Sequence, residues 1–587
     1  MRAAARDLMS CCTSKLLDCP KPQSKPQSPV YASYSLRKNP PQPSDDSLPD
    51  VAWLIGRTLV RSQHWADREE NETVLLSEEQ ETGTQVSIAF PTWSAYHSLT
   101  ASEVLLITKV GTPPLIASPA HEWSTLLTVL KQAQGISAKV MGPDRKTVIT
   151  LDLGLYKPAK QLQMARKDMD HLVLRPGELH IVMAQLRCIG AYIENSGIDY
   201  CWTEADLYGP VTVKQLIEGK HVRRAIEAHV VTLQSLFQLY QTAFLQNHPD
   251  LQRVLTEAAQ ALVVASVDGS TEGMQEAHSA MVQAIQSCGV MQKMAQFDAA
   301  NGKKLLLVVM RQYMEMIMEM LMFIRSVRTG NWNLHIQSVE NLTKHFFALD
   351  KQNYACLMPL YLADIELLRQ SDPDIYQEFM KGNWVVNKNR CVAFCSVGAD
   401  HALEHINRSM KVAGGLVGIT QNEYARSKFF LISPELARLA GEACEVADIS
   451  SPAQTHHHAL SAAVVIRQEK SIEALTSTIE RFFNPFAEES FDLFNLVTKA
   501  IMPEKVKNDL CNESTIGRQL FEEFVTNRIR SADVNVWDTM KKTKLHTWKT
   551  TGKRVKINTG DKIGSSKKIA NCSPACCWFP SQDPTST

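Results

Sequence analysis

The segment Thr147–Met183 constrains the fold more than any other part of this chain. Two apolar runs, Thr147–Asp152 and His171–Arg175, flank a stretch with helical spacing and a proline in its first turn, Pro158–Lys167. A strand, a helix and a second strand in this order form a crossover unit, in which the two strands run parallel. The segment therefore predicts an α/β core.

Polar side chains follow both predicted strands. Asp152 ends the first strand, and Glu178 and His180 follow the second. Because parallel strands bring their carboxyl ends to one edge of the sheet, we expect these residues at that edge, where α/β folds place metal or phosphate chemistry. Carboxylates there could hold Mg²⁺ or Mn²⁺ and act on a phosphoryl group. In the structural alternative, Asp152 caps the turn into the next helix, and Arg175 pairs with Glu178 at the surface.

A second acidic pair lies far along the chain. Asp400 and Glu404 are four residues apart, which places both on one face of a helix. An RNase H-like nuclease site would need such an acid on a late helix, and a large helical insertion ahead of that helix is compatible with the fold. The structural alternative is a solvated helix face that also carries His401, His405 and Arg408.

The strand pattern gives way to helices along the chain. Further strand-like runs occur at Val86–Phe90 and Val104–Gly111, before a predicted helix at His121–Gln134. From Lys214 to Ala348 the pattern consists of apolar stripes of period 3.6, typical of packed helices. We therefore predict a mixed α+β and α/β fold. It has a small mixed sheet, with an RNase H-like core as one candidate, a large helical insertion and a helical C-terminal half.

These patterns divide the chain into five regions. Residues 1–50 contain a run rich in Pro, Ser, Gln and Lys, which predicts a disordered arm. The α/β sheet region spans residues 51–213, and the helical insertion spans residues 214–348. A mostly helical region at residues 349–525 completes the core. Residues 526–587 are predicted to form a basic, flexible tail.

Composition limits the class of protein. With 44% hydrophobic and 21% charged residues, the chain is typical of globular proteins with large cores, and its net charge of +0 gives no overall attraction to nucleic acid or membrane. The most apolar stretch, Leu305–Ile324, is interrupted by Arg311, Glu315 and Glu319, so we expect a buried helix and no membrane partner. The irregular spacing of the 14 cysteines indicates reduced thiols and an intracellular location.

The segment Lys541–Lys568 is strongly basic, with ten Lys or Arg against one acid. Such a segment can neutralise the phosphates of DNA, and it can also serve as a nuclear address. The structural alternative is a solvated tail. The candidate nucleic-acid-binding residues are Lys541, Lys542, Lys544, Lys549, Lys553, Arg554 and Lys556.

Several phrases resemble a group of long, largely uncharacterised animal proteins that are often described as CXC-domain-containing-related and associated with mobile elements. They include TLDLGLYKPA (Thr150–Ala159), RPGELHIVM (Arg175–Met183), ALDKQNYACLMPLY (Ala348–Tyr361) and VWDTMKKTKLHTWKTTGK (Val536–Lys553). The resemblance covers roughly residues 51–556 and implies no established activity. Longer members resemble fusions with a cysteine-rich, zinc-binding module, for which the C-terminal sequence here has too few cysteines.

The resemblance implies a transposon-derived protein with a degenerate RNase H-like core. If Val86–Phe90 is the first strand, no acid ends it. Asp152 is then the second acid and Glu404 the third, so one metal ligand is missing. If Asp152 is the first acid, Glu178 follows after only one helix, too soon for that topology. We therefore expect a nucleic-acid-associated protein, and the missing ligand favours lost over retained catalysis.

Any retained activity would be that of a metal-dependent nuclease or strand transferase. Asp152, Glu178, His180 and Glu404 would be its candidate catalytic residues, and Asp152 and Glu404 its ligands for Mg²⁺ or Mn²⁺. The second hypothesis is a non-enzymatic scaffold, in which the helical insertion at residues 214–348 binds a protein partner. An enzyme requires these acids, together with Asp400, near a common point, whereas a scaffold does not.

Overall fold

The strand–helix–strand unit predicted from the sequence forms the sheet of this protein. In the computed structural model, strand β1 (Thr147–Leu151) and strand β2 (Leu172–Pro176) pair in parallel, with Leu151 opposite Pro176 at their carboxyl ends. Helix α5 (Leu153–Ala165) makes the crossover between them. All of β2 is buried, as expected for a strand within an α/β core. Among the described residues the sheet consists of these two strands.

The structure describes residues 45–70, 90–412 and 461–551 and parts of residues 16–36 and 424–442. Within the three long ranges it leaves out residues 102–103, 112–115, 117, 269, 388–392, 488 and 544. The described residues up to Thr550 belong to one compact unit. The region boundaries predicted after residues 213, 348 and 525 stay predictions.

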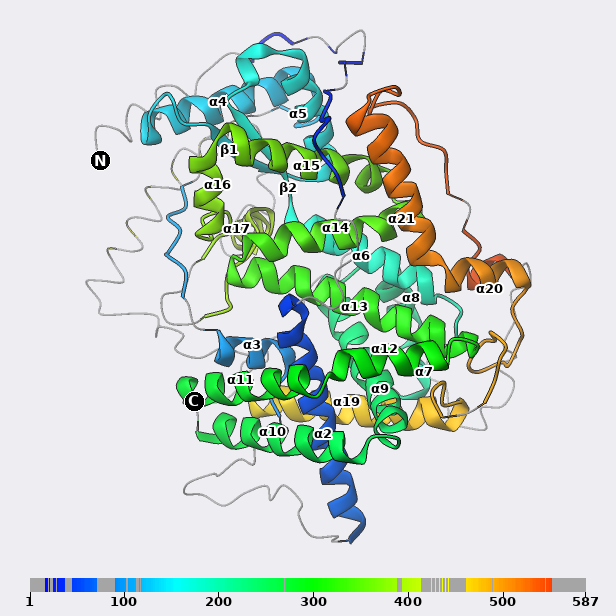
Figure 1. Ribbon diagram of the computed structural model, residues 1–587. Coiled ribbons are helices and arrows are strands. Elements are labelled where there is room, and N and C mark those ends of the chain that lie inside the picture. The colour runs from blue at the N-terminus through cyan, green and yellow to red at the C-terminus, as the bar shows by residue number, and fades with distance from the viewer. Residues whose placement is uncertain are drawn as a thin grey trace, which may run out of the picture. The chain divides into compact units, whose positions relative to one another are not determined.

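Helices make up most of the described chain, which confirms a mainly helical fold with a small sheet. Figure 1 shows α13 (Leu305–Thr329) and α14 (Trp332–Ala348) crossing the middle of the view. The Met-rich sequence of α13 is buried along most of its length. None of the helices in the described part of the chain is long and apolar enough to cross a membrane.

The remaining α-helices are α2 (Leu48–Glu70), α3 (Trp93–Thr100), α4 (Trp123–Met141), α6 (Glu178–Ile193), α7 (Ile198–Glu204), α8 (Pro210–Ile217), α9 (Val222–Leu245), α10 (Pro249–Asp268), α11 (Thr271–Ser287), α12 (Val290–Ala300), α15 (Gln352–Ser371), α16 (Pro373–Met380), α17 (Ala399–Val412), α19 (Ala462–Phe482), α20 (Glu504–Cys511) and α21 (Glu513–Phe524). Short 3-10 or π-helical turns lie at Asp45–Ser47, Lys167–Met169, Val525–Arg530 and Trp548–Thr551.

The boundary between α13 and α14 follows directly from the sequence. Gly330 ends α13 with a φ of 68°, and a Cβ there would lie 2.7 Å from Cδ1 of Leu105. The next residue, Asn331, caps α14, because its side chain accepts a hydrogen bond from the backbone N–H of Leu334 at 3.0 Å. A glycine that stops one helix and an asparagine that starts the next therefore set the crossing of two central helices.

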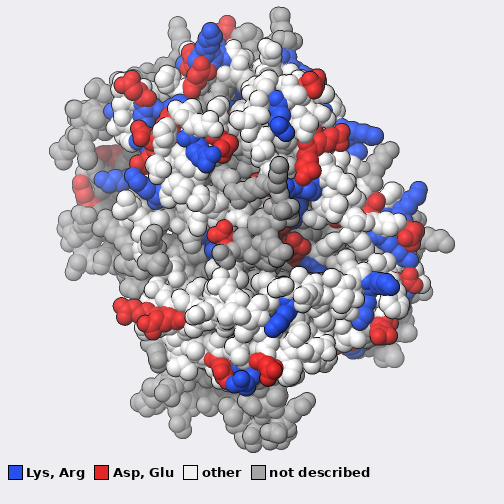
Figure 2. All heavy atoms as spheres, in the orientation of Figure 1, with Lys and Arg blue, Asp and Glu red and all other residues white. Residues whose placement is uncertain are grey.

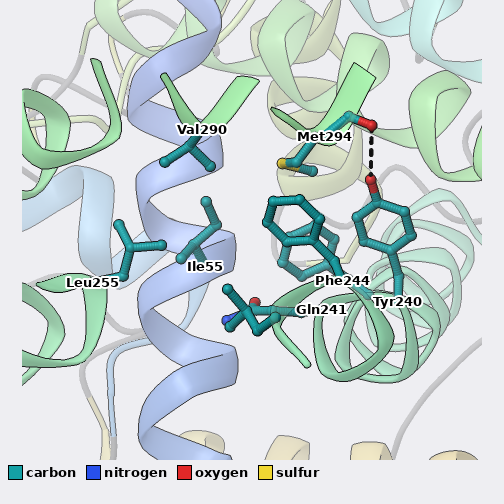
Figure 3. A pocket seen from close by; sticks show the side chains of 9 residues that line it. Ile55, Tyr240, Gln241, Phe244, Leu255, Val290 and Met294 are labelled. Atoms are coloured by element: carbon teal, nitrogen blue, oxygen red, sulfur yellow. Dashed lines mark hydrogen bonds between the residues drawn. The ribbon is translucent and has the colours of Figure 1, made fainter. Parts of the chain in front are cut away.

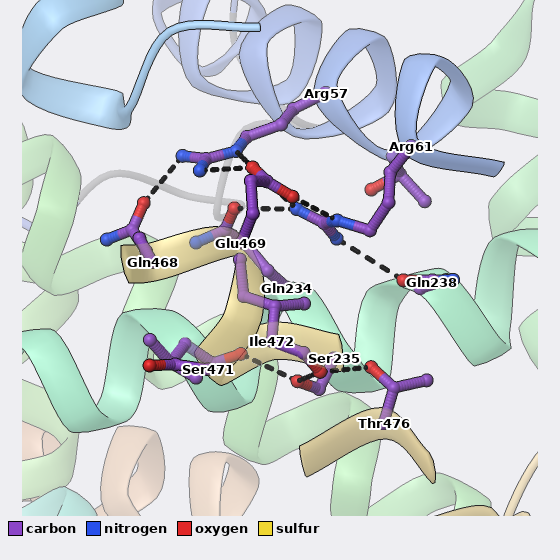
Figure 4. A network of polar contacts seen from close by, with 12 residues as sticks. Arg57, Arg61, Gln234, Ser235, Gln238, Gln468, Glu469, Ser471, Ile472 and Thr476 are labelled. Carbon is purple, nitrogen blue, oxygen red and sulfur yellow. Dashed lines mark hydrogen bonds and ion pairs between the residues drawn. The ribbon is translucent and has the colours of Figure 1, made fainter. Parts of the chain in front are cut away.

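A buried polar network attaches α19 to α2 and α9 (Figure 4). Glu469 of α19 accepts hydrogen bonds from Arg57 at 2.9 Å and from Arg61 at 2.7 Å, both on α2. Gln234 and Gln238 of α9 lie within hydrogen-bond distance of Arg61. Although burial alone would raise it, the two arginines lower the pKa of Glu469 to about 2. The network therefore joins three helices that are far apart in the sequence.

A small apolar cavity lies between α2, α9, α10 and α12 (Figure 3). Neither amide atom of Gln241, in its lining, is hydrogen-bonded to any described residue. The lining carries no carboxylate, imidazole or thiol, so we assign it no chemistry. The lining residues are Ile55, Phe237, Tyr240, Gln241, Phe244, Leu245, Leu255, Val290 and Met294.

Two predicted strands outside the crossover unit have different outcomes. The prediction of a strand at Val104–Gly111 is wrong, because the described residues there have no regular structure. Their backbone pairs with one residue only: Thr108 donates its N–H to the carbonyl of Asn387 at 2.8 Å. A strand needs a ladder of such bonds with a neighbour. In the predicted strand Val86–Phe90, residues 86–89 lie outside the described residues, and Phe90 is buried.

Described residues of both terminal regions are attached to the helical body. Near the N-terminus, Tyr31 donates its N–H to the carbonyl of Ile529 at 2.9 Å, and Tyr34 is buried. Near the C-terminus, Trp537 and Trp548 are buried. The disordered arm predicted for residues 1–50 and the flexible tail predicted for residues 526–587 stay predictions. Buried aromatic side chains hold the described positions.

Candidate acidic site at the sheet edge

The carboxyl ends of β1 and β2 place the first predicted acid. Asp152 follows β1 directly and is exposed, and its Oδ1 accepts a hydrogen bond from the N–H of Leu155 at 2.8 Å. Asp152 is thus the N-cap of α5, which confirms the structural alternative for this residue. The cap also explains why α5 begins at Leu153, five residues before the helix predicted to start at Pro158.

The other two predicted residues lie on a helix and not at a strand end. Glu178 and His180 follow β2 as expected, but they already belong to the first turn of α6, which begins at Glu178 directly after Gly177. This turn brings their side chains to the same edge of the sheet as Asp152, at the N-terminus of α6. The N-terminus of a helix carries unpaired N–H groups and a partial positive charge, which favours acidic side chains.

Asp400 of α17 reaches the N-terminus of α6. Its Oδ1 accepts a hydrogen bond from the N–H of Leu179 at 3.2 Å, and its Oδ2 accepts one from the N–H of His180, also at 3.2 Å. The Nδ1 atom of His180 lies 3.0 Å from Oδ2 of Asp400. Although burial alone would raise it, the pKa of Asp400 is lowered by His180 and by these N–H groups. Asp400 therefore caps a helix to which it does not belong.

Glu178 is paired with Arg175 inside the protein. One nitrogen of the guanidinium contacts Oε1 of Glu178, and the two side chains are only 1% and 2% exposed. The prediction of this pair was correct, but its location at the surface was wrong. Burial raises the pKa of Glu178 to about 7, with Arg175 lowering it and Asp400 raising it further. Glu178 is therefore far easier to protonate than an exposed glutamate.

Aromatic rings hold Arg175 in place. Its guanidinium lies 5.4 Å from the ring centre of Trp332, 5.4 Å from that of Phe379 and 5.0 Å from that of Trp384. It also donates a hydrogen bond to the carbonyl of Trp384 at 3.0 Å. β2, α14, α16 and the residues after α16 thus converge beneath Glu178. Cation–π contacts of this kind strengthen as water is excluded.

Glu178 and Asp400, which are far apart in the sequence, both lie close to Gly398. A Cβ on this glycine would lie 2.7 Å from Oε2 of Glu178 and 2.9 Å from Oδ1 of Asp400. The hydrogen bond that the His180 ring donates to Asp400 is the main cause of the raised pKa of His180, with burial opposing it and the charges of Asp400, Asp152 and Glu404 adding to it. Asp152, Asp400 and Glu404 therefore all act electrostatically on His180, and Asp400 also acts on Glu178.

This convergence does not produce a recognisable metal centre. No group of three or more His, Cys, Asp or Glu residues in the described part of the chain is arranged to hold a metal ion. Asp400 uses both oxygens on α6, and Asp152 caps α5. Binding of Mg²⁺ or Mn²⁺ by Asp152 and Glu404 stays a prediction.

The predicted nucleic-acid-binding residues fall into two groups. Lys541 and Lys542 are exposed, and Lys549 is paired with Glu194, which follows α6. The other four, Lys544, Lys553, Arg554 and Lys556, lie outside the described residues.

Sequence reasoning identified the acids of this site but missed how they are held. The aromatic residues around Arg175 come from positions more than 150 residues away and leave no local signal. The capping role of Asp400 is equally hidden, since 220 residues separate it from His180. Gly177 directly precedes Glu178 and Gly398 lies two residues before Asp400, and these glycines are the local signal that could have been used. A glycine beside a charged residue often marks a close approach.

The fold and the site define a mainly helical protein with an acidic cluster at the edge of a parallel strand pair. Residues 92–571 match the family described as Domain of unknown function (DUF8702), and the chain belongs to that family. No curated protein and no solved structure matches it.

Proposed function

We propose that this chain is a transposon-derived, nucleic-acid-associated protein whose RNase H-like core has lost catalysis. The observation that carries the proposal is the convergence of Glu178 and Asp400 at Gly398, at the edge where β1 and β2 end. A strand, a helix, a strand, a long helical block and a late helix with acids follow one another in the chain, which is compatible with a degenerate form of such a core. The resemblance to mobile-element-associated, CXC-domain-related proteins favours the same interpretation.

The contacts of the acids favour loss of catalysis. Two-metal phosphoryl transfer needs carboxylate oxygens that are free to bind ions about 3.5–4 Å apart. Both carboxylate oxygens of Asp400 accept hydrogen bonds from N–H groups of α6, and one oxygen of Glu178 is paired with Arg175. With a pKa of about 7, Glu178 is also partly protonated at neutral pH, which weakens it as a ligand. Asp152 and Glu404 would remain as an incomplete ligand set.

The association with nucleic acid rests on the basic C-terminal sequence. Lys541–Lys568 carries ten basic residues against one acid, and DNA is the partner that this charge suits best. An intracellular protein with this segment would also be directed to the nucleus. If DNA does not bind, the better proposal is a non-enzymatic scaffold. The helical region at residues 214–348 would then bind a protein partner.

One assay tests binding and catalysis together. The full chain is incubated with labelled duplex DNA and Mn²⁺, and binding, cleavage and strand transfer are recorded for the wild type, Asp152→Ala and the control Asp144→Ala. Asp144 is an exposed acid of the turn before β1. We expect salt-dependent binding by all three proteins and no cleavage by any of them. Cleavage that Asp152→Ala abolishes and Asp144→Ala retains would overturn the loss of catalysis, and absence of binding would overturn the association with DNA.

A further inference from the structure

Helices α6 and α8 pack closely and bring together basic side chains from both. A Cβ on Gly190 of α6 would lie only 2.0 Å from the carbonyl oxygen of Ile217, at the end of α8. Two residues later, a Cβ on Gly219 would lie 2.8 Å from Cγ of Arg187. The exposed Arg187 of α6 therefore lies directly against the turn that follows α8. The two glycines make this contact possible.

Three lysines surround the same turn. The ammonium group of Lys220 lies 2.7 Å from Glu218, and its hydrogen bond is the main cause of the lowered pKa of Glu218. The charges of Lys220, Lys214 and Lys549 lower this pKa further, so all three lie within electrostatic range of one carboxylate. Lys220 is 63% exposed and Lys549 is 55% exposed. Their ammonium groups are accessible to a ligand.

The residues around Lys549 are held against the helical body by several contacts. Trp548 is buried, and Lys549 is paired with Glu194, the residue that ends α6. His546 is also held, because its N–H donates to Asp509 of α20 at 2.7 Å. The described residues end at Thr551, so Lys553, Arg554 and Lys556 follow directly in the sequence.

Charges of both signs are distributed over one face of the molecule. On the face drawn in Figure 2, Lys and Arg side chains are interspersed with Asp and Glu. Of the cations Arg187, Lys214, Lys220 and Lys549, two are paired with acids: Lys220 with Glu218 and Lys549 with Glu194. The sequence from Lys553 to Lys568 is also basic.

We propose that Arg187, Lys214, Lys220 and Lys549 form a surface that binds the phosphate backbone of duplex DNA. The inference rests on the proposed association with nucleic acid and locates it on the folded body. Exposed, flexible lysines and an arginine contact phosphates without reading base sequence, so binding is independent of sequence and strongly dependent on salt. The acids Glu194 and Glu218 keep the cations in place when no DNA is bound.

The test compares salt slopes in the full chain. Fluorescence anisotropy gives the affinity for a labelled duplex over a range of salt concentrations, for the wild type and for Lys214→Gln with Lys220→Gln. The control, Arg369→Gln with Lys381→Gln, removes the same charge from two exposed residues, each also paired with an acid three residues away. Because each lost phosphate contact lowers the slope of log affinity against log salt by about 1, we expect the first variant to lose about 2 and the control to lose nothing.

Three outcomes are distinguishable once equal melting temperatures show that all variants fold. A smaller slope in the first variant alone supports the surface. DNA binding with the same slope in all three proteins overturns the surface and leaves the proposed association with nucleic acid in place. No binding by the wild type overturns both.

Discussion

The Oδ2 atom of Asp400 lies 3.0 Å from Nδ1 of His180, although 220 residues separate the two in the sequence. The contact joins the start of α17 to the start of α6, at the edge where the two strands end. It therefore decides whether the acids from the two halves of the chain form one cluster.

Removing the Asp400 carboxylate should destabilise the protein and change the titration of His180. Asp400→Ala leaves two N–H groups of α6 without a partner, which should cost about 2 kcal/mol in the free energy of unfolding. The pKa of His180 should also fall, because the hydrogen bond that its ring donates to Asp400 is what chiefly raises it. Denaturant unfolding and NMR titration measure the two effects. Glu404→Ala, an exposed position one turn further along α17, should change stability by less than about 0.5 kcal/mol.

Two glycine-to-alanine changes should have opposite signs. In Gly177→Ala the new Cβ would lie 2.4 Å from Oδ2 of Asp400, which is held by two N–H groups, so we expect a loss of about 1–3 kcal/mol. In Gly135→Ala, within α4, nothing lies within 4 Å of the new Cβ, so the helix should gain about 0.5–1 kcal/mol. Thermal unfolding of both variants measures these changes in stability. Equal effects would contradict the close approach of Asp400 to Gly177.

Buried His345 should make stability fall at alkaline pH. It lies 2.6 Å from Glu319 and 3.0 Å from Glu513, and despite burial these acids raise its pKa to about 9. A raised histidine pKa stabilises the fold fully below the unfolded value near 6.5, and this contribution disappears as pH rises through about 9. Unfolding measured from pH 6 to pH 10 should show a steeper loss for the wild type than for His345→Gln. Parallel curves would show that His345 is neutral in the folded protein.

Glu178 should destabilise the fold as pH rises through a lower window. Its pKa is about 7 in the folded protein, above the usual value of 4.5, so the folded state binds its proton more tightly than the unfolded state. Its contribution is therefore most favourable below pH 4.5 and is lost as pH rises through about 7. The difference in unfolding free energy between wild type and Glu178→Gln should change over this window. A constant difference would mean that Glu178 ionises like an exposed glutamate.

The sequence predicted those parts of the fold that depend on neighbouring residues. The apolar runs on either side of Pro158–Lys167 identified both strands of the crossover. The strand predicted at Val104–Gly111 failed because a strand requires a partner that local pattern does not supply. The pairing of Asp400 with His180 was out of reach for the same reason: it depends on packing across the whole fold.

We infer that the acids gathered at the sheet edge do not form a metal site. Titration of the full chain with Mn²⁺, followed by the electron paramagnetic resonance signal of free Mn²⁺, counts the bound ions in the wild type and in Asp152→Ala. We predict the same weak, non-stoichiometric binding in both proteins. One or two tightly bound Mn²⁺ ions that Asp152→Ala removes would contradict the account.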